Sequence, residues 1–276
     1  MKKMSRSIFE PIYHLLSRPK ALLILLFKVC HSLFLWLYVV LVFIVGDLFI
    51  PVIILFAKDK KEIPHIWLRY ASKLLFYLAF IPVKIEGLDN IPTERPLIIL
   101  PNHQGHFDYP IMFMAIPFRF SYIAKKELFA LPIFGRYFRI AGFYMLDRNA
   151  AMSAYNTMEE VGEAMKTGDS ILIFPEGTRT ENGSVGEFKG GALKLAYKLG
   201  VPILPVAISG SFGIMRKLSW IVNSKKVKIK IGKPIYFQKN EEVDLETYKK
   251  AIQDVHAVVA KLLEELEAEN KPAAKA

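Results

Sequence analysis

A histidine and an aspartate stand five positions apart, as His103 and Asp108, directly after an apolar run. An imidazole can take a proton from a hydroxyl group, while a carboxylate beside it orients the ring and stabilises its charged form. This pair therefore predicts general-base chemistry. A second interpretation is structural: Asp108 could cap a helix that begins near Pro110, with His103 as a packing residue. Short motifs often match by chance, so the loop alone leaves both interpretations open.

A metal site is a third interpretation of this loop, because His103, His106 and Asp108 offer imidazole and carboxylate ligands. The other four histidines stand outside any compact cluster, and the spacing matches no zinc pattern. Cys30 is the only cysteine, which excludes an intrachain disulfide and a thiolate metal cluster and favours a reducing, cytoplasmic setting. We therefore predict no bound metal and no resident cofactor.

Polar residues of opposite charge follow the apolar run 171–174. Arg179 could hold a phosphate through two charge-assisted hydrogen bonds, and Glu176 could accept a hydrogen bond from a substrate hydroxyl. Gly177, which lies between them, permits a close approach of the backbone. An ion pair between Glu176 and Arg179 in a tight turn is the alternative, and for this peptide by itself that alternative is slightly favoured.

The apolar run 143–146 ends in the same way, with Asp147 and Arg148. Arg148 is a candidate second phosphate contact and Asp147 a candidate orienter, whereas an ion pair between the two neighbours is the ordinary alternative. Ligands of open α/β sheets bind at the carboxyl ends of strands. Two apolar runs that both end in an acid and an arginine therefore indicate a ligand site more strongly than one such run.

Short β-branched runs alternate with helical stretches after residue 82, a pattern typical of an α/β sheet. The predicted strands are 83–86, 97–100, 120–124, 143–146, 170–174, 203–208 and 227–231. Helices are predicted over 151–166 and 190–199, each stopped by a glycine, and over 244–267, where an aspartate stands at the start. This sheet must present the charged residues at the ends of its strands.

An apolar stretch of 29 residues, Val29–Ala57, contains a single charged residue, Asp47. As one helix it would measure about 43 Å, which exceeds the bilayer core of about 30 Å. Gly46 and Pro51 interrupt the stretch, so we expect a broken helix that turns back as a hairpin. Lysine and arginine flank both ends, which would leave both ends on the cytoplasmic side. The stretch begins too late and runs too long for a signal peptide.

The helical stretch 66–82 is expected to lie in the membrane interface or to pack against the α/β domain. The formal net charge of +11 favours an anionic partner. Together with this charge, the apolar stretch favours membrane lipids over nucleic acid as the anionic partner. No zinc finger or RNA-binding aromatic motif is present, so nucleic-acid binding is disfavoured.

Taken in order, four blocks of the chain resemble the glycerolipid acyltransferase family, and specifically the 1-acylglycerol-3-phosphate acyltransferases of bacterial membranes. The blocks are 102–108, 142–148, 174–179 and 201–205, within a resemblance that covers roughly 83–208. It implies an α/β acyltransferase fold, with a mixed sheet flanked by helices and an N-terminal membrane-anchoring helical segment. The implied parts are a membrane-associated helical region over 1–81, a catalytic domain over 82–243, and a C-terminal helix with a frayed tail over 244–276.

The resemblance assigns roles to individual residues. His103 would be the general base and Asp108 its orienter. The substrate-binding residues would be Arg148, Glu176, Gly177, Thr178 and Arg179. No serine nucleophile is needed, because the substrate hydroxyl attacks, so Ser209 and Ser211 are expected to be structural and no acyl-enzyme to form. Backbone amides near His103 or Gly105 could stabilise the oxyanion.

The implied reaction moves an acyl group from acyl-CoA or acyl-carrier protein to the sn-2 hydroxyl of lysophosphatidate, which gives phosphatidate for phospholipid synthesis. The enzyme would lie on the inner (cytoplasmic) membrane with its catalytic domain facing the cytoplasm, and its partners would be membrane lipids and these substrates. Two alternatives stay open. One is the same chemistry on another lysolipid, such as a lyso-ornithine lipid, and the other is a non-catalytic protein that binds lipid at the membrane surface.

Overall fold

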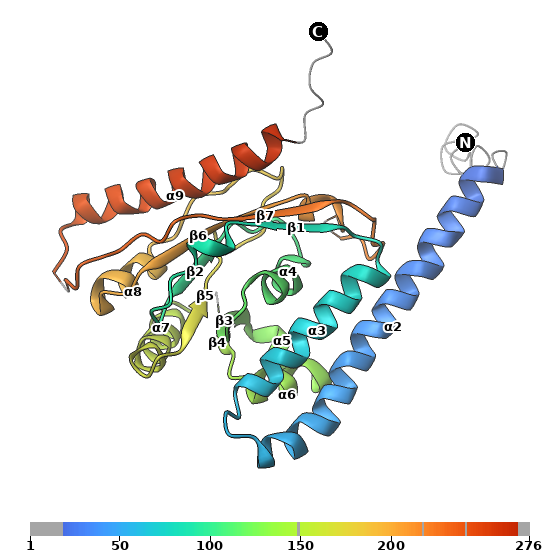
Figure 1. Ribbon diagram of the computed structural model, residues 1–276, viewed down its shortest axis with the longest axis horizontal. Coiled ribbons are helices and arrows are strands. Elements are labelled where there is room, and N and C mark those ends of the chain that lie inside the picture. The colour runs from blue at the N-terminus through green and yellow to red at the C-terminus, as the bar shows by residue number, and fades with distance from the viewer. Residues whose placement is uncertain (1–18, 148–149, 217, 241, 270–276) are drawn as a thin grey trace, which may run out of the picture.

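A seven-stranded sheet forms the centre of the protein, whose computed structural model describes residues 19–147, 150–216, 218–240 and 242–269 (Figure 1). The strands are β1 (Val83–Glu86), β2 (Ile98–Pro101), β3 (Phe120–Lys125), β4 (Tyr144–Leu146), β5 (Ser170–Leu172), β6 (Ile203–Ser209) and β7 (Val227–Ile231). Their order across the sheet is β1-β7-β6-β2-β5-β3-β4. Every neighbouring pair is parallel except β6 with β7. The sheet is therefore mixed, as predicted, and each predicted strand appears within two residues of its expected bounds.

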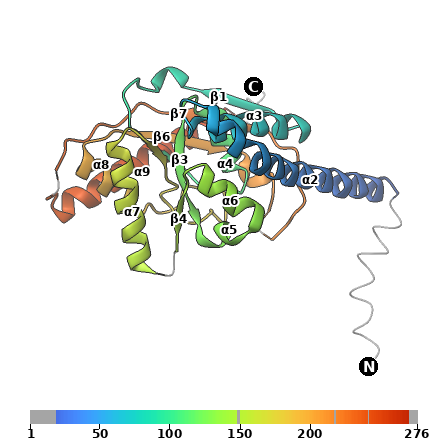
Figure 2. The same cartoon turned by 90° about the horizontal axis from the view of Figure 1, so that it is seen from below.

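Different helices cover the two faces of the sheet (Figures 1 and 2). On one side lie α2 (Pro19–Phe56), α3 (Glu62–Leu78), α4 (Asp108–Ala115), α5 (Lys126–Ala130) and α6 (Pro132–Ile140). On the other side lie α7 (Ala151–Lys166), α8 (Gly191–Leu199) and α9 (Leu245–Ala268). Two short 3-10 helices, η1 (Leu88–Asn90) and η2 (Ser211–Gly213), lie in loops. The predicted helices over 151–166, 190–199 and 244–267 are confirmed.

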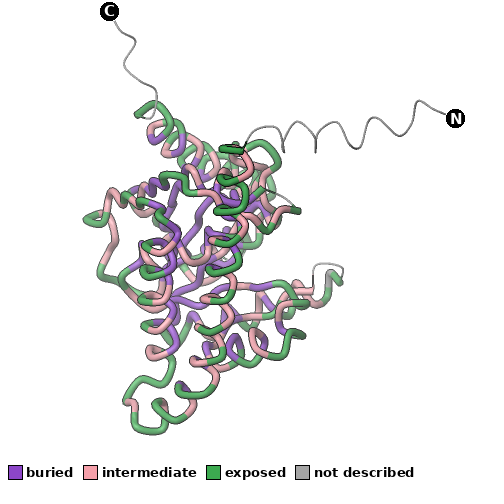
Figure 3. The backbone as a smooth tube through the Cα atoms, turned by 90° about the vertical axis from the view of Figure 1, so that its right-hand side faces the viewer, coloured by how far each residue is buried: buried purple, intermediate pink, exposed green. Residues whose placement is uncertain are grey.

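β2 is the central strand of the sheet, and all four of its residues are buried. Figure 3 shows that buried residues gather in the middle of the molecule. The side chains of β2 alternate between two cores: Ile99 packs on the side of α3 and α4, whereas Ile98 and Leu100 pack against α7 and α8. A strand that is covered on both faces has a continuous apolar sequence, and residues 97–100 are all apolar and buried. The residues that follow β2 therefore leave a rigid and fully buried element.

α2 is one continuous helix, so the predicted break near Gly46 and Pro51 is wrong. The chain turns instead at residues 57–61, and α3 then runs back beside α2 (Figure 1). Gly46 is buried against α6, where an added Cβ would lie 2.7 Å from the ring of Tyr137. This glycine therefore serves helix packing and not a turn. Pro51 removes one backbone hydrogen bond inside the helix but does not end it.

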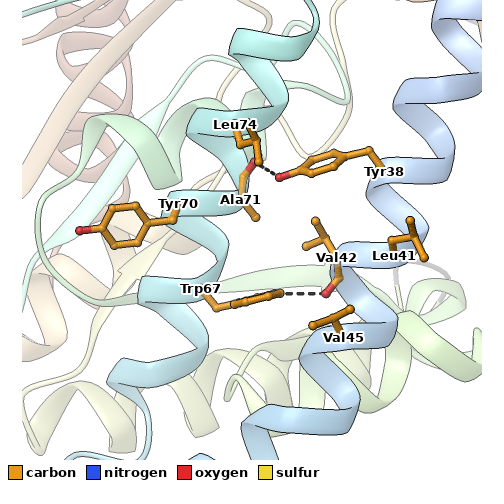
Figure 4. A pocket seen from close by; sticks show the side chains of 8 residues that line it. All are labelled: Tyr38, Leu41, Val42, Val45, Trp67, Tyr70, Ala71 and Leu74. Atoms are coloured by element: carbon orange, nitrogen blue, oxygen red, sulfur yellow. Dashed lines mark hydrogen bonds between the residues drawn. The ribbon is translucent and has the colours of Figure 1, made fainter.

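Two hydrogen bonds join α2 to α3 beside an apolar hollow of about 330 Å³ (Figure 4). The Tyr38 hydroxyl donates to the Ala71 carbonyl at 2.8 Å, and the Trp67 indole donates to the Val42 carbonyl at 3.1 Å. α3 in turn packs on α4, which confirms the expectation that this stretch contacts the α/β domain. The two helices therefore form one unit that is attached to the sheet.

Much of the apolar surface of α2 faces outward. Leu23, Phe27, Leu55 and Phe56 each leave between 63% and 86% of their surface exposed. Among the helices that the structure describes, α2 is the one with the length and composition to cross a membrane, and 11% of its most apolar window is buried. A long apolar helix with so little burial suggests association with a membrane.

Candidate active site

Three neighbouring strands bring the motif loops together at one edge of the sheet. β2 lies between β5 and β6 and runs parallel to both, so the carboxyl ends of all three point the same way. The loops that leave these ends are 102–107 after β2, 173–180 after β5, and 210–213 after β6. In open α/β sheets this edge is where ligands bind. β4 ends at the same edge, beyond β5 and β3.

Asn102 fixes the start of the first loop. Its fully buried side chain bonds β6 twice: Nδ2 donates to the Ile208 carbonyl at 3.0 Å, and Oδ1 accepts from the Ile208 amide at 2.7 Å. A side chain thereby continues the ladder between β2 and β6 beyond its last backbone pair, Pro101 with Val206. The loop therefore leaves the sheet in a defined direction.

His103 and Asp108 are in direct contact. His103 Nδ1 lies 2.7 Å from Asp108 Oδ2, and the two side chains expose 6% and 0% of their surface. Because the carboxylate can only accept, Nδ1 carries the proton and Nε2 keeps a lone pair. This is the arrangement that a general base and its orienter require.

Asp108 is not a helix cap, so the capping interpretation is wrong. It is the first residue of α4, and its Oδ2 accepts from the amides of Gln104 and Gly105 at 2.6 and 2.8 Å. Both amides precede the helix, whereas a capping side chain accepts from amides inside it. The carboxylate therefore folds the loop 102–107 around itself, at the positive end of the helix.

Ser211 supplies a further donor to Asp108. Its hydroxyl oxygen lies 2.5 Å from Asp108 Oδ1, and the residue is 1% exposed. Both carboxylate oxygens are thus engaged, one by Ser211 and the other by His103 and two amides. The sequence shows only that Ser211 follows a strand by two residues. That this strand neighbours β2 is a property of the fold, so the contact was not predicted.

Two aromatic rings hold the plane of the imidazole. Phe174 stacks on His103 with ring centroids 4.0 Å apart and planes at 23°. Tyr109 meets the same imidazole edge-on, at 5.8 Å between centroids. Neither contact was predicted, because aromatic residues beside a motif are common in ordinary cores. The stack and the bond to Asp108 together fix both the position and the tilt of the base.

Both carboxylate oxygens of Glu176 accept hydrogen bonds, and one of these comes from the loop 102–107. Oε1 accepts from the His103 amide at 2.8 Å and Oε2 from the Gly186 amide at 3.1 Å, and the residue is 5% exposed. Burial raises the pKa of this carboxyl, and the two amide bonds oppose that shift. The Thr180 amide donates to the His103 carbonyl at 2.8 Å, so the loop 173–180 is bonded on both sides of His103. The bond from Glu176 to a substrate hydroxyl stays a prediction.

The backbone amides of residues 103–105 all have partners inside the protein. The His103 amide donates to Glu176. The amides of Gln104 and Gly105 donate to Asp108. The expectation that amides near His103 or Gly105 stabilise an oxyanion is therefore wrong for these three groups.

Arg179 lies at the same edge, near His106. Burial lowers the pKa of His106, and the positive charges of Arg179 and of protonated His103 lower it further. Glu176 is occupied by backbone amides, and Arg179 makes no ion pair within the part of the chain that the structure describes. The alternative of an ion pair between Glu176 and Arg179 is therefore wrong, and the half-buried guanidinium is available to an anion.

The other predicted substrate residues surround this loop. Thr178 is exposed. Gly177 has a left-handed backbone with φ of 69°, and an added Cβ would lie 2.9 Å from the side chain of Lys189. The backbone of Gly177 thus packs closely against Lys189, and its contact with a substrate stays a prediction. Arg148 lies outside the described residues, and its neighbour Asp147 bonds Lys126 at 3.1 Å.

Comparison with known proteins points to one family. A family model described as Acyltransferase matches residues 82–209. The chloroplastic 1-acyl-sn-glycerol-3-phosphate acyltransferase of Brassica napus is 31% identical over 211 residues, which cover 75% of this chain and 60% of that protein. The 1-acyl-sn-glycerol-3-phosphate acyltransferase of Pseudomonas aeruginosa is 32% identical over 186 residues, which cover 67% of this chain and 71% of that protein.

A solved structure is similar as well. The crystal structure of the 1-acyl-sn-glycerophosphate acyltransferase PlsC from Thermotoga maritima matches with a TM-score of 0.71 and 30% sequence identity, covering 87% of this chain and 98% of that one. The chain spans 60% of the length of the Brassica napus relative and 56% of a chloroplastic relative from Arabidopsis thaliana.

Proposed function

Because the chain belongs to the acyltransferase family, we propose that it moves a fatty acyl group from a thioester to the sn-2 hydroxyl of 1-acyl-sn-glycerol 3-phosphate. One observation carries the proposal: His103 Nδ1 contacts the buried Oδ2 of Asp108 at 2.7 Å, which leaves Nε2 as a base. Relatives of similar sequence and fold are named for this reaction. The product would be phosphatidate, for phospholipid synthesis.

The chemistry needs no nucleophile from the protein. His103 Nε2 takes the proton from the acceptor hydroxyl as its oxygen attacks the thioester carbonyl. The new C–O bond forms, the C–S bond breaks, and the departing thiolate receives the proton from the imidazolium. General-base help of this kind is worth about 10² to 10⁴ in rate. Asp108 holds the tautomer of His103 and stabilises the imidazolium that forms on the way.

The phosphate of the acceptor would lie beside the loop after β5. Arg179 supports this proposal, since its half-buried guanidinium lies near the dyad loop and makes no ion pair with the described residues. Gly177 and Thr178 belong to the same loop, and Arg148, which follows β4 in the sequence, is proposed as a second phosphate contact. A planar guanidinium can bind a phosphate with two parallel hydrogen bonds. Glu176 contributes by holding this loop to His103.

The acceptor and the protein would meet at a membrane. α2 exposes apolar side chains along much of its length, which supports attachment to a membrane. We propose the cytoplasmic face of the inner membrane as the place of attachment. An enzyme held there reaches a lysolipid without drawing its acyl tail into water. Acyl-CoA or acyl-carrier protein would arrive from the cytoplasm as the donor substrate, and the reaction as proposed uses no resident cofactor.

Release of free thiol tests the proposal. The purified protein receives acyl-CoA or acyl-carrier protein, and thiol is followed after lysophosphatidate is added. We expect release that depends on lysophosphatidate and that His103→Ala abolishes. His256→Ala changes a histidine of α9 that contacts Phe188, and this control should keep full activity. A His103→Ala variant with near-normal transfer would sink the proposal.

The same assay separates the two alternatives. If a lyso-ornithine lipid outcompetes lysophosphatidate and Arg179→Ala has no effect on turnover, the acceptor has no phosphate and the proposed substrate is wrong. If the protein binds lipid vesicles but never releases thiol from either donor, it is a lipid-binding protein and the proposed activity fails.

A further inference from the structure

The loop between β6 and β7, residues 210–226, connects the dyad to α2. At its start, Ser211 donates to Asp108 at 2.5 Å. Farther along, the Trp220 carbonyl accepts from the indole of Trp36, which belongs to α2, at 2.8 Å. The loop is therefore attached to the catalytic edge of the sheet at one end and to the outer helix at the other.

Leu218 and Trp220 of this loop expose large apolar side chains to solvent. Leu218 is fully exposed and Trp220 is 45% exposed, whereas Ile214 and Val222 on either side of them are buried. Scattered exposed apolar residues are ordinary on soluble proteins. These two are different, because the backbone of Trp220 is bonded to an apolar helix that is itself exposed.

The exposed apolar surface continues from the loop onto α2. On the face of α2 that carries Trp36, Leu33 lies one turn away and is 56% exposed. A second bond, from the Val222 amide to Ser32 Oγ at 3.0 Å, holds the loop against the same part of the helix. Tryptophan beside exposed apolar residues is typical of the boundary between lipid and water.

The same loop carries exposed positive charge. Arg216, Lys225 and Lys226 are exposed, and the sequence 210–226 contains no acidic residue. Basic residues near a membrane surface are attracted to anionic headgroups. An acidic protein would meet these charges but would have to bury Leu218 and Trp220 as well as the neighbouring apolar face of α2. A lipid surface satisfies the charges and the apolar side chains together.

We propose that Leu218 and Trp220, with the basic residues beside them, form a second membrane contact that inserts into the interface of an anionic bilayer. The proposal rests on the proposed function in one respect, namely that the acceptor is a membrane lipid. Insertion here brings the loop that carries Ser211 to the level of the headgroups. The dyad then meets the acceptor while the acyl tail stays in the bilayer.

Site-specific fluorescence tests the contact directly. Cys30, the single cysteine, is replaced by alanine, and Leu218→Cys is labelled with an environment-sensitive fluorophore. On vesicles of phosphatidylglycerol and phosphatidylcholine we expect a blue shift and quenching by nitroxide-labelled lipids. A label at Lys250→Cys, near the start of α9 and at the opposite end of the molecule from α2, should show neither (Figures 1 and 2). Absence of quenching at 218 on protein that floats with the vesicles would overturn the proposal.

Turnover provides an independent test with the double variant Leu218→Gln/Trp220→Gln. On lysophosphatidate in anionic vesicles, its rate at limiting vesicle concentration should fall about tenfold, since two apolar side chains no longer contribute to binding. On a short-chain lysophosphatidate dissolved as monomers, the rate should be unchanged. The matched control Tyr236→Gln/Leu245→Gln alters two other exposed apolar residues, 65% and 64% exposed, and should leave both rates unchanged.

The outcomes separate this contact from the proposed activity. An unchanged rate on vesicles, or an equal loss on vesicles and on the dissolved acceptor, would contradict the membrane contact. If the unaltered protein turns over neither acceptor, the proposed function fails, and the quenching at position 218 alone decides whether the contact exists.

Discussion

At the residue scale, the buried carboxylate of Asp108 determines the geometry of the dyad. It receives hydrogen bonds from the His103 ring, from two amides of the loop before α4 and from the Ser211 hydroxyl. A buried charge without such donors would be costly. The donors fix the carboxylate, the carboxylate fixes Nδ1 of His103, and Phe174 fixes the plane of the ring. These contacts hold the imidazole of His103 in one orientation without a substrate.

Ser211→Ala should lower kcat about tenfold, because it removes one donor from buried Asp108. The KM for the acceptor should stay near its original value, since Ser211 is 1% exposed and its hydroxyl contacts the carboxylate of Asp108. Ser211→Thr keeps the hydroxyl and should recover most of the loss. Ser209→Ala, at another buried serine of the same region, is the matched control. A raised KM with unchanged kcat in steady-state kinetics would show that Ser211 binds the acceptor instead.

Glu176→Gln should lower kcat at least about tenfold. A glutamine side chain can accept from one of the two amides, at His103 or Gly186, but turns its own NH₂ group toward the other. Arg179→Ala should instead raise the KM for lysophosphatidate, because it removes the proposed phosphate contact. If Glu176→Gln raises KM as Arg179→Ala does, Glu176 binds the substrate in the way the sequence first suggested.

At the element scale, local sequence patterns located the strands and helices but not their neighbours. The contact between His103 and Asp108 was predictable because only five positions separate the two residues in the sequence. Ser211 meets Asp108 only because β6 lies beside β2, and no local pattern encodes that pairing. The misread break in α2 has a similar cause. Gly46 looks like a helix breaker in sequence, whereas the contact that requires it comes from Tyr137 on α6.

The packing of α3 on the sheet should be sensitive to acid. His65 of α3 is 3% exposed, and its ring lies 5.1 Å from that of Phe113 and 4.8 Å from that of Phe120. Burial, assisted by the charges of Arg69 and Arg119, lowers the pKa of His65 to about 3. A histidine in the unfolded chain titrates near about 6.5. The unfolded state therefore binds more protons between these two values, and stability falls as the pH drops through that window.

His65→Phe should remove this acid sensitivity. His65 alone should lower the free energy of unfolding by about 2 kcal/mol between pH 7 and pH 5. Phenylalanine keeps the ring contacts and cannot take up a proton. Denaturant titrations at the two pH values, with His256→Phe as the control, measure the difference. A His65→Phe protein that is as acid-sensitive as the unaltered one would contradict this assignment.

At the scale of the whole molecule, the two edges of the sheet carry different charged clusters. The dyad lies at the carboxyl edge, while Asp169 lies next to the start of β5, at the other edge. Asp169 accepts from Arg119 and from Lys61, both at 2.6 Å. Burial alone would raise the pKa of Asp169, but these two bonds lower it. Because Lys61 lies in the turn between α2 and α3, this cluster attaches the outer helices to the sheet, away from the chemistry.

The difference between these two aspartates gives the most direct test of the central claim, that His103 with Asp108 is the general base. Single-turnover acyl transfer to a dissolved lysophosphatidate is measured for Asp108→Asn and Asp169→Asn. The rate of Asp108→Asn should be lower by a factor of about 10² to 10⁴, because asparagine no longer holds the proton on Nδ1 of His103. Asp169→Asn should transfer the acyl group at the original rate, although this variant should be less stable. A folded Asp108→Asn variant that transfers at the original rate would contradict the claim.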